Sequence, residues 1–210
     1  MARRRSSRPA YGFHGTKPEP DAWRRSAGTQ RAILAAAARL VRRLGYNRVT
    51  IEAVAAEAGA GKQTIYRWWK TKAALFAELL GENGPAPSAR PTRRRPSPLR
   101  ELRTVAAALA RSNASALRAS VYAGLIAEAA GDRAVASLVQ TRLVQAQTDA
   151  LKAILARART AGVIRRNADI GLAAEQIVAG LWFRGVVSTQ RADQRFADRL
   201  VAQVVRGLGP

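Results

Sequence analysis

The chain has 210 residues and is 48% hydrophobic, which is enough for one or two domains with a real core. It carries 36 lysines and arginines against 14 acidic residues, a net charge of +22 that favours nucleic acid or an anionic membrane surface as partner. Cysteine is absent and His14 is the only histidine, so disulfides and thiolate metal sites are excluded and we expect no metal site, no cofactor and no enzymatic activity.

Residues 1–25 are rich in Arg, Ser, Pro and Gly and lack apolar periodicity, which predicts a basic disordered arm. A solvated tail is the first interpretation of this arm, and a phosphate or minor-groove contact is the second. The sequence has no run of about 18 uncharged apolar residues and no apolar stretch after its N-terminal arginines. We therefore expect a cytoplasmic protein without a membrane span or a secretory signal.

Residues 26–81 are predicted to form a DNA-binding domain. In residues 29–44, Ile33, Ala37 and Leu40 follow helical spacing, and the helix is expected to end at Gly45. Residues 50–69 predict two short helices: Thr50 caps the first, Gly59 ends it, and the second begins near Lys62. Two such helices form a helix-turn-helix unit, whose second helix enters the major groove of DNA. A further helix is expected from a cap at Thr71.

The second short helix carries side chains suited to DNA. Lys62, Gln63 and Thr64 are the predicted base readers, since lysine pairs with guanine, glutamine with adenine, and threonine offers a hydroxyl and a methyl group. The predicted contacts to the DNA backbone are Arg48, Thr50, Tyr66, Trp68 and Lys72. Each could instead be an ordinary surface residue, and Trp68 could be part of the core. Ile65 and Trp69 are expected to pack inward.

Residues 29–80 resemble the N-terminal domain of the tetracycline-repressor (TetR) family of bacterial regulators. The resemblance is carried by Arg31–Ala37, Gly45-Tyr46, Val49-Thr50-Ile51, Gly61–Trp69 and Lys72–Leu75. It implies a homodimeric transcription factor, usually a repressor, which binds a palindromic operator and is released by a small ligand. It also implies DNA contacts at Thr50, Lys62, Gln63, Thr64, Tyr66, Trp68 and Lys72. Gly61 and Trp68 depart from the residues common in the family. The alternative is a nucleoid-type protein that binds DNA without sequence preference.

Residues 82–98 contain five prolines and the run Arg93–Arg95, which predicts a linker that is solvated or adds a phosphate contact. Residues 99–210 are predicted to form a helical ligand-binding and dimerisation domain. Its expected helices are 99–111, 114–130, 133–161, 169–188 and 193–207. No segment alternates like a strand, so the fold class is all-α.

The last two expected helices have apolar faces, so they are predicted to form a dimer interface, although both faces could be buried within one subunit. The interface residues would be Ile177, Leu181, Phe196, Leu200 and Val204. A ligand pocket is predicted among the middle helices, with plain core as the alternative. Its candidate residues are Arg118, Tyr122, Ile126, Leu143, Trp182 and Phe183. Arg111 and Arg118 could favour an anionic ligand, but solvated arginines are commoner.

Overall fold

The computed structural model describes residues 27–82, 96–188 and 190–209. The predicted arm of residues 1–25 and the linker arginines Arg93–Arg95 lie outside this part of the chain. Throughout the described ranges the secondary structure is helical and contains no strand, which confirms the all-α prediction.

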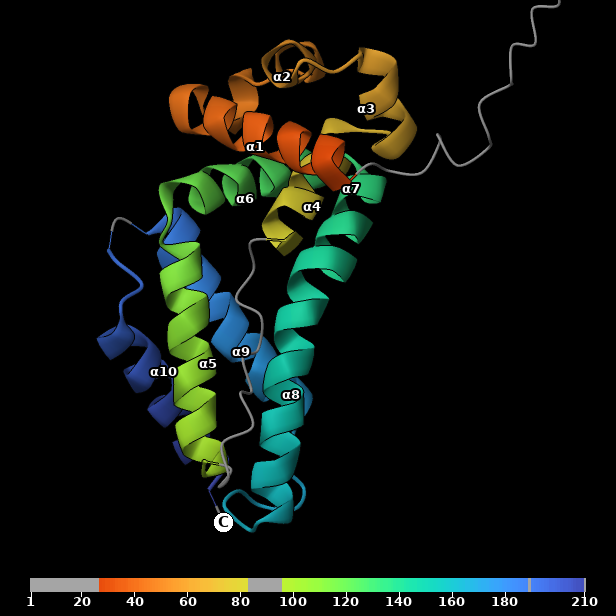
Figure 1. Cartoon of the computed structure of the whole chain (residues 1–210). Coiled ribbons are helices and arrows are strands. Elements are labelled where there is room, and N and C mark those ends of the chain that lie inside the picture. The colour runs from red at the N-terminus through yellow and green to blue at the C-terminus, as the bar shows by residue number, and fades with distance from the viewer. Residues whose placement is uncertain (1–26, 83–95, 189, 210) are drawn as a thin grey trace, which may run out of the picture.

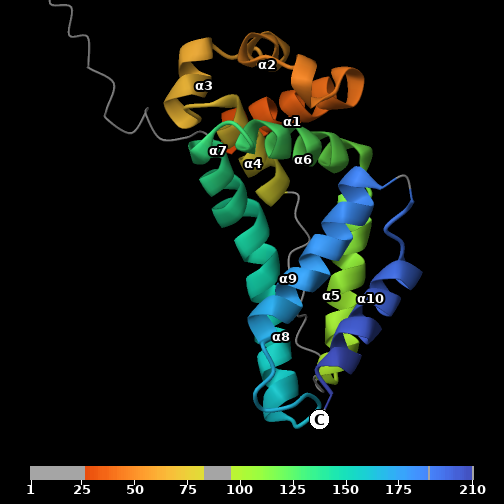
Figure 2. The same ribbon diagram turned by 180° about the vertical axis from the view of Figure 1, so that it is seen from behind.

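The helices form a small head on top of a longer bundle (Figure 1). The head contains α1 (Ala27–Leu44), α2 (Ile51–Ala58) and α3 (Lys62–Trp68), and α4 (Lys72–Glu82) runs from it toward the bundle. The remaining helices are α5 (Pro98–Asn113), α6 (Ala116–Ala129), α7 (Arg133–Val139), α8 (Gln145–Thr160), α9 (Ile170–Trp182) and α10 (Gln194–Gly207). Helix α6 lies across the bundle directly beneath α1, as the view from behind also shows (Figure 2).

The helix ends in the head follow from local side-chain and backbone chemistry. The Thr50 hydroxyl accepts a hydrogen bond from the Ala53 amide at 3.1 Å, and the Thr71 hydroxyl accepts one from Ala74 at 3.1 Å. Gly59 ends α2 with φ of 63°, a left-handed conformation that side chains disfavour. The start of α2 after Thr50, its end at Gly59 and the start of α4 after Thr71 were all predicted and are confirmed. A short 3₁₀ turn at Tyr46–Arg48, between α1 and α2, was not expected.

The expected helix 133–161 is interrupted by a π turn, Gln140–Val144, between α7 and α8. Buried residues follow four-residue steps at Val135, Val139 and Leu143, and then a five-residue step leads to Thr148. The extra residue of this five-residue step changes the direction of the buried face. As a result, α7 packs under the head while α8 packs in the bundle. A second π turn, Phe183–Val187, ends α9. Neither turn contains a proline that would mark a break in the helix, and the hydrophobic spacing did not indicate one either.

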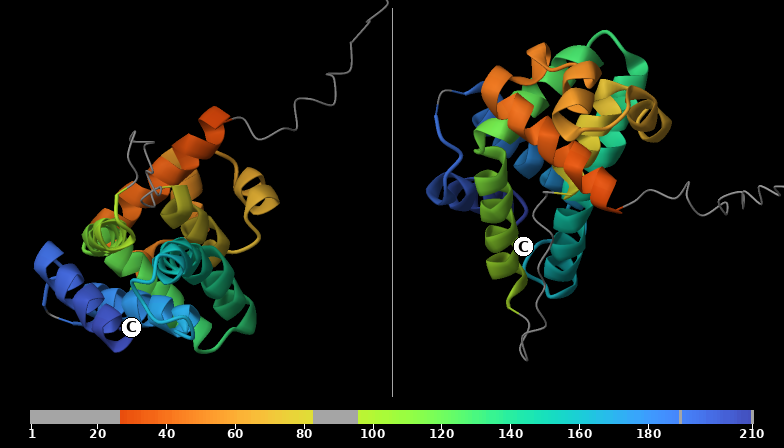
Figure 3. Two further views of the ribbon diagram at one scale, coloured as in Figure 1. Left: turned by 90° about the horizontal axis from the view of Figure 1, so that it is seen from below. Right: turned by 45° about the horizontal axis from the view of Figure 1, so that its top comes forward.

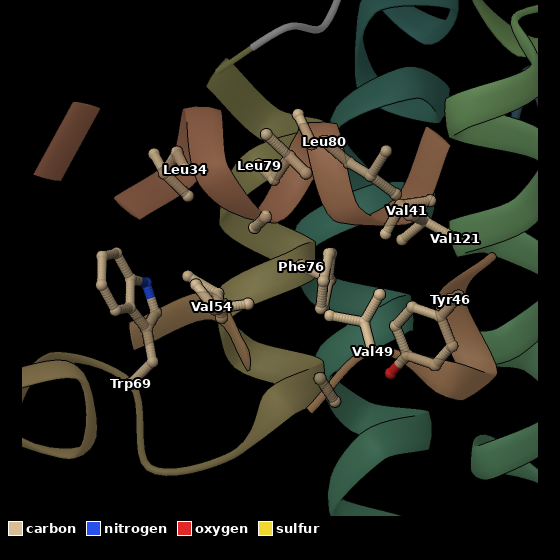
Figure 4. Close-up of a cluster of buried hydrophobic side chains, with 14 of the residues drawn as sticks. Leu34, Val41, Tyr46, Val49, Val54, Trp69, Phe76, Leu79, Leu80 and Val121 are labelled. Carbon is tan, nitrogen blue, oxygen red and sulfur yellow. The ribbon is translucent and has the colours of Figure 1, made fainter. Parts of the chain in front are cut away.

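Two apolar cores result. The first lies in the head and is continued by residues of α6, with Val121 next to Val41 and Leu80 (Figure 4). The second lies between α5, α8, α9 and α10, which lie next to one another in the view from below (Figure 3, left). The head is therefore seated on α6 by shared apolar packing.

The structure corrects two of the predicted dimer residues. Ile177 and Leu181 are both 0% exposed inside the bundle core, where no partner chain could reach them. Phe196, Leu200 and Val204 are half-buried on α10. The error arose because α9 is apolar on two faces, and spacing cannot tell which face turns inward. The outer face of α9 exposes Leu172, and the π turn that follows exposes Phe183 and Val187.

Within the described residues, one helical stretch, Ile170–Val187, is long and apolar enough to cross a membrane by length and composition alone. This stretch is α9 with its π turn, and α9 packs against α5, α8 and α10. A core helix of a bundle meets the same criteria, so the observation is weak evidence for a membrane span.

Candidate nucleic-acid interface

Helix α3 separates a buried side from a polar side. Ile65 and Trp69 are 0% and 2% exposed, and the Trp69 indole N–H donates to Glu78 Oε2 at 2.9 Å. Lys62 and Gln63 are exposed, as is Tyr66, at 43%. The inward packing of Ile65 and Trp69 is thus confirmed.

The other candidate residues of the head lie beside this polar side or in the segment before α2. Thr64 and Trp68 are half-buried, and the Trp68 ring meets the Trp69 ring edge to face with centroids 5.6 Å apart. Arg48 is exposed, and its Nε donates to the Leu44 carbonyl at 2.8 Å. Thr50 is exposed; its hydroxyl accepts from the Ala53 amide in the cap and also hydrogen-bonds the Glu52 side chain.

Acidic side chains on α2 neutralise part of this basic head. Lys62 Nζ lies 3.2 Å from Glu52 Oε1, and both side chains are more than half exposed. A backbone hydrogen bond at the start of α2, together with Lys62, holds the pKa of Glu52 below its usual range. Binding of a phosphate or base by Lys62 would therefore require it to exchange Glu52 for the new partner.

The predicted anchor Lys72 points toward α6 in this structure. Its Nζ donates to the Tyr46 carbonyl at 3.2 Å, lies 4.0 Å from the centre of the Tyr46 ring and lies 3.7 Å from Glu128 Oε1. The Tyr46 hydroxyl donates to the other oxygen of Glu128 at 3.0 Å. Burial, and then Glu128, raise the pKa of Tyr46 above its usual range. Sequence reasoning missed Glu128 because it lies in a different helix, far along the chain.

Replacing Glu128 with glutamine should strengthen binding to DNA about threefold to tenfold at moderate salt. The substitution removes the carboxylate that competes with phosphate for Lys72, while the amide oxygen can still accept from the Tyr46 hydroxyl. The slope of log Kd against log salt, measured by fluorescence anisotropy, should steepen by about one unit.

The control is Asp149→Asn, which makes the same change of charge on the exposed surface of α8. It should leave the salt slope unchanged. Equal strengthening by both variants would mean that net charge, and not the contact with Lys72, sets the affinity.

The predicted ligand residues are only partly brought together. Arg118 Nη2 donates to the Tyr122 hydroxyl at 2.8 Å, and the Tyr122 and Trp182 ring centroids are 4.5 Å apart. Leu143 is buried in the core beneath the head. Ile126 and Phe183 are 41% and 61% exposed, on outward faces of α6 and α9, so the structure does not bring them into this group.

Sequence reasoning also missed a bridge and a groove near Trp182. Gln147 accepts from the Trp182 indole at 3.1 Å and donates to the Tyr122 hydroxyl at 3.3 Å. Trp182 lines a groove of about 390 Å³ between α8 and α9. Its further lining comprises Gln140, Val144, Gln145, Thr148, Val178, Ala179 and two charged residues, Lys152 and Glu175.

Comparisons with known proteins agree with a helix-turn-helix head on a helical C-terminal domain. Residues 33–79 match the family model described as bacterial regulatory proteins, tetR family, and residues 96–204 match the tetracyclin repressor-like C-terminal domain. The uncharacterized HTH-type transcriptional regulator YdeS of Bacillus subtilis is 28% identical over 188 residues, which cover 88% of this chain and 91% of YdeS.

Two solved structures share the fold at low identity. Salmonella enterica GusR superimposes with a TM-score of 0.69 at 18% identity, covering 88% of this chain and 97% of GusR. FadR of Bacillus subtilis, in complex with stearoyl-CoA, superimposes with a TM-score of 0.68 at 18% identity, covering 84% of this chain and 98% of FadR.

Proposed function

The chain belongs to the TetR family of transcriptional regulators, and from this we propose that it is a homodimeric repressor that leaves a palindromic operator when a small ligand binds. The proposed site of action is the cytoplasm, on the bacterial nucleoid. The observation that carries the proposal is the division of α3 into a buried side and a polar side. Ile65 and Trp69 hold the helix in place while Lys62 and Gln63 are exposed.

In the proposed complex α3 lies in the major groove. Lys62, Gln63 and Thr64 stand in its first turn, the part of a recognition helix that contacts base edges. Arg48, Thr50, Tyr66, Trp68 and Lys72 are proposed to contact the sugar-phosphate backbone.

The proposed dimer uses the outer faces of α9 and α10. Phe183 and Val187 are exposed apolar residues at the end of α9. Phe196, Leu200 and Val204 are half-buried on α10, and Leu200 packs over Gly180 of α9. Pairing these faces about a twofold axis would bury them and present two heads to two half-sites.

The proposed effector site lies where Arg118, Tyr122 and Trp182 meet. FadR, which shares the fold, was determined with stearoyl-CoA, so the fold can hold a small ligand. Because the two chains are only 18% identical, the ligand of FadR does not indicate which ligand this chain binds.

Selection of genomic fragments by the purified protein tests the proposal. We expect enrichment of one palindrome that binds two chains, with roughly 10³-fold or greater preference over random DNA. Gln63→Ala should reduce discrimination at one A·T position of that palindrome by about tenfold, measured by competition binding. Asn167→Ala, an exposed residue in the turn before α9, is the control and should change nothing.

The net charge of +22 supports a second candidate, a protein that coats DNA through charge alone. That protein would bind operator and random fragments with equal affinity at physiological salt. It would also leave no discrete footprint, so the same selection decides between the two.

A further inference from the structure

Apart from aromatic side chains with a polar group, the buried polar side chains of the described residues are Asn113, Arg118 and Thr148. The Thr148 hydroxyl donates to carbonyls one turn earlier in its own helix. Arg118 Nε and both polar side-chain atoms of Asn113 are buried without a hydrogen-bond partner. Such atoms are costly to bury, so their presence needs a reason.

Arg118 also lacks a counter-charge. It is 6% exposed, its Nη1 donates to the Leu80 carbonyl at 2.8 Å, and its Nη2 donates to the Tyr122 hydroxyl at 2.8 Å. Both acceptors are neutral, and no carboxylate of the described residues lies within ion-pair distance. A buried guanidinium is ordinarily matched by an anion. Within the described chain, the surroundings of Arg118 therefore lack a negative charge to balance the guanidinium and a hydrogen-bond acceptor for its Nε.

The rings of Tyr122 and Trp182 connect the Arg118 guanidinium to a groove. Tyr122 contacts Arg118 on one side and the Trp182 ring on the other. Trp182 in turn lines the groove of about 390 Å³, whose walls include the apolar Val144 and Val178 and an oppositely charged pair of residues, Lys152 and Glu175, that leaves the lining with no net charge. The π turn Gln140–Val144 contributes Gln140 and Val144 to the lining of this groove, and the π turn Phe183–Val187 begins directly after Trp182. π turns are frequent at functional sites.

We propose that the effector is an organic anion whose carboxylate pairs with Arg118 and whose apolar part lies in the groove beside Trp182. This inference rests on the proposed function, since it identifies the chemistry of the ligand that releases the operator. A guanidinium binds a carboxylate through two parallel hydrogen bonds, which would engage Nε and one terminal nitrogen.

Pairing with the anion has a consequence for the head. Leu80 belongs to the last turn of α4, where helix carbonyls lack intrahelical partners, and Arg118 supplies one. A carboxylate on Nε and Nη2 takes the place of the Tyr122 hydroxyl, and a shift of the guanidinium toward the carboxylate lengthens the Nη1 bond to the Leu80 carbonyl at the end of α4. Since α4 begins at Lys72 in the head, the anion and DNA would favour different positions of this helix. Each ligand then weakens binding of the other.

Calorimetry with octanoate and octanamide, two ligands that share a chain and differ in charge, tests the proposal on the full-length protein. We expect octanoate to bind with a Kd below about 1 mM and octanamide to bind at least tenfold more weakly. Arg118→Gln should abolish the preference for octanoate. Arg111→Gln, an exposed arginine on α5, should keep it. If Arg118→Gln fails to fold by circular dichroism, Lys152→Gln decides the question: it should keep the preference for octanoate, because the proposal assigns the carboxylate to Arg118 and not to the lysine of the groove.

Absence of binding, equal binding of the two ligands, or an unchanged preference in Arg118→Gln would overturn the proposal. If water or another neutral group occupies the site beside Arg118, octanoate should bind no more tightly than octanamide. Octanoate should also weaken operator binding by about fivefold or more. If operator binding is normal and octanoate fails, only this inference falls; if no operator exists, the calorimetry still reports on the anion site while the proposed function falls.

Discussion

Trp69→Ala should lower the free energy of unfolding by about 3–5 kcal/mol and abolish DNA binding. The Trp69 ring is 2% exposed and packs in the core that holds α3 against α1 and α2. Its removal leaves a large cavity and takes away the indole donor to Glu78. Urea denaturation followed by far-ultraviolet circular dichroism measures the loss directly.

Trp68→Ala is the matched control, because Trp68 is the neighbouring residue but is only half-buried. We expect it to cost less than about 2 kcal/mol and to leave a folded protein with weaker DNA binding. If both alanine variants lost the same stability, the division of α3 into a core side and a DNA side would be wrong.

Gly124→Ala should destabilise the protein by about 3 kcal/mol, because there is no space for a methyl group at this position. A Cβ atom on Gly124 would lie 2.0 Å from Cδ1 of the Tyr46 ring. Tyr46 is 1% exposed, packs edge to face on Phe76 and donates its amide N–H to Ser120 Oγ, so it has little freedom to retreat. Thermal denaturation should show a fall of several degrees.

Gly131→Ala provides the comparison, since a Cβ atom there meets nothing within 4 Å and the backbone is not left-handed. Its stability should change by less than about 0.5 kcal/mol. DNA binding gives a second measurement: Gly124→Ala should weaken it by moving the turn before α2, and Gly131→Ala should not. A Gly124→Ala protein as stable as the unaltered chain would show that α6 can move away from the head at no cost.

Features set by near neighbours in the chain could be predicted from the sequence. Gly59 and Thr50 fix the ends of α2 through local geometry and one hydrogen bond, and both appear where expected. The polarity of α3 follows from helical spacing, so the positions of Ile65 and Trp69 along the helix were sufficient to assign them to the core.

Features set by distant packing could not be predicted in this way. Spacing marked both faces of α9 as apolar, but only its contacts with α5 and α8 turn Ile177 inward and leave Phe183 outside. The engagement of Lys72 by Glu128 depends on how α6 crosses beneath the head. The π turn at Gln140–Val144 likewise follows from the two cores that it separates, and neither core is visible in local spacing.

The core that joins the head to α6 limits how such a gene could be recombined. A segment encoding only residues 27–82 would carry Phe76 and Leu80 without Val121 and Leu125, which belong to the same buried cluster. Exchange of DNA specificity between relatives by swapping that segment would place unmatched surfaces together. The smallest exchangeable unit would extend through Leu143, and new operators would more readily be acquired by point changes on the polar side of α3.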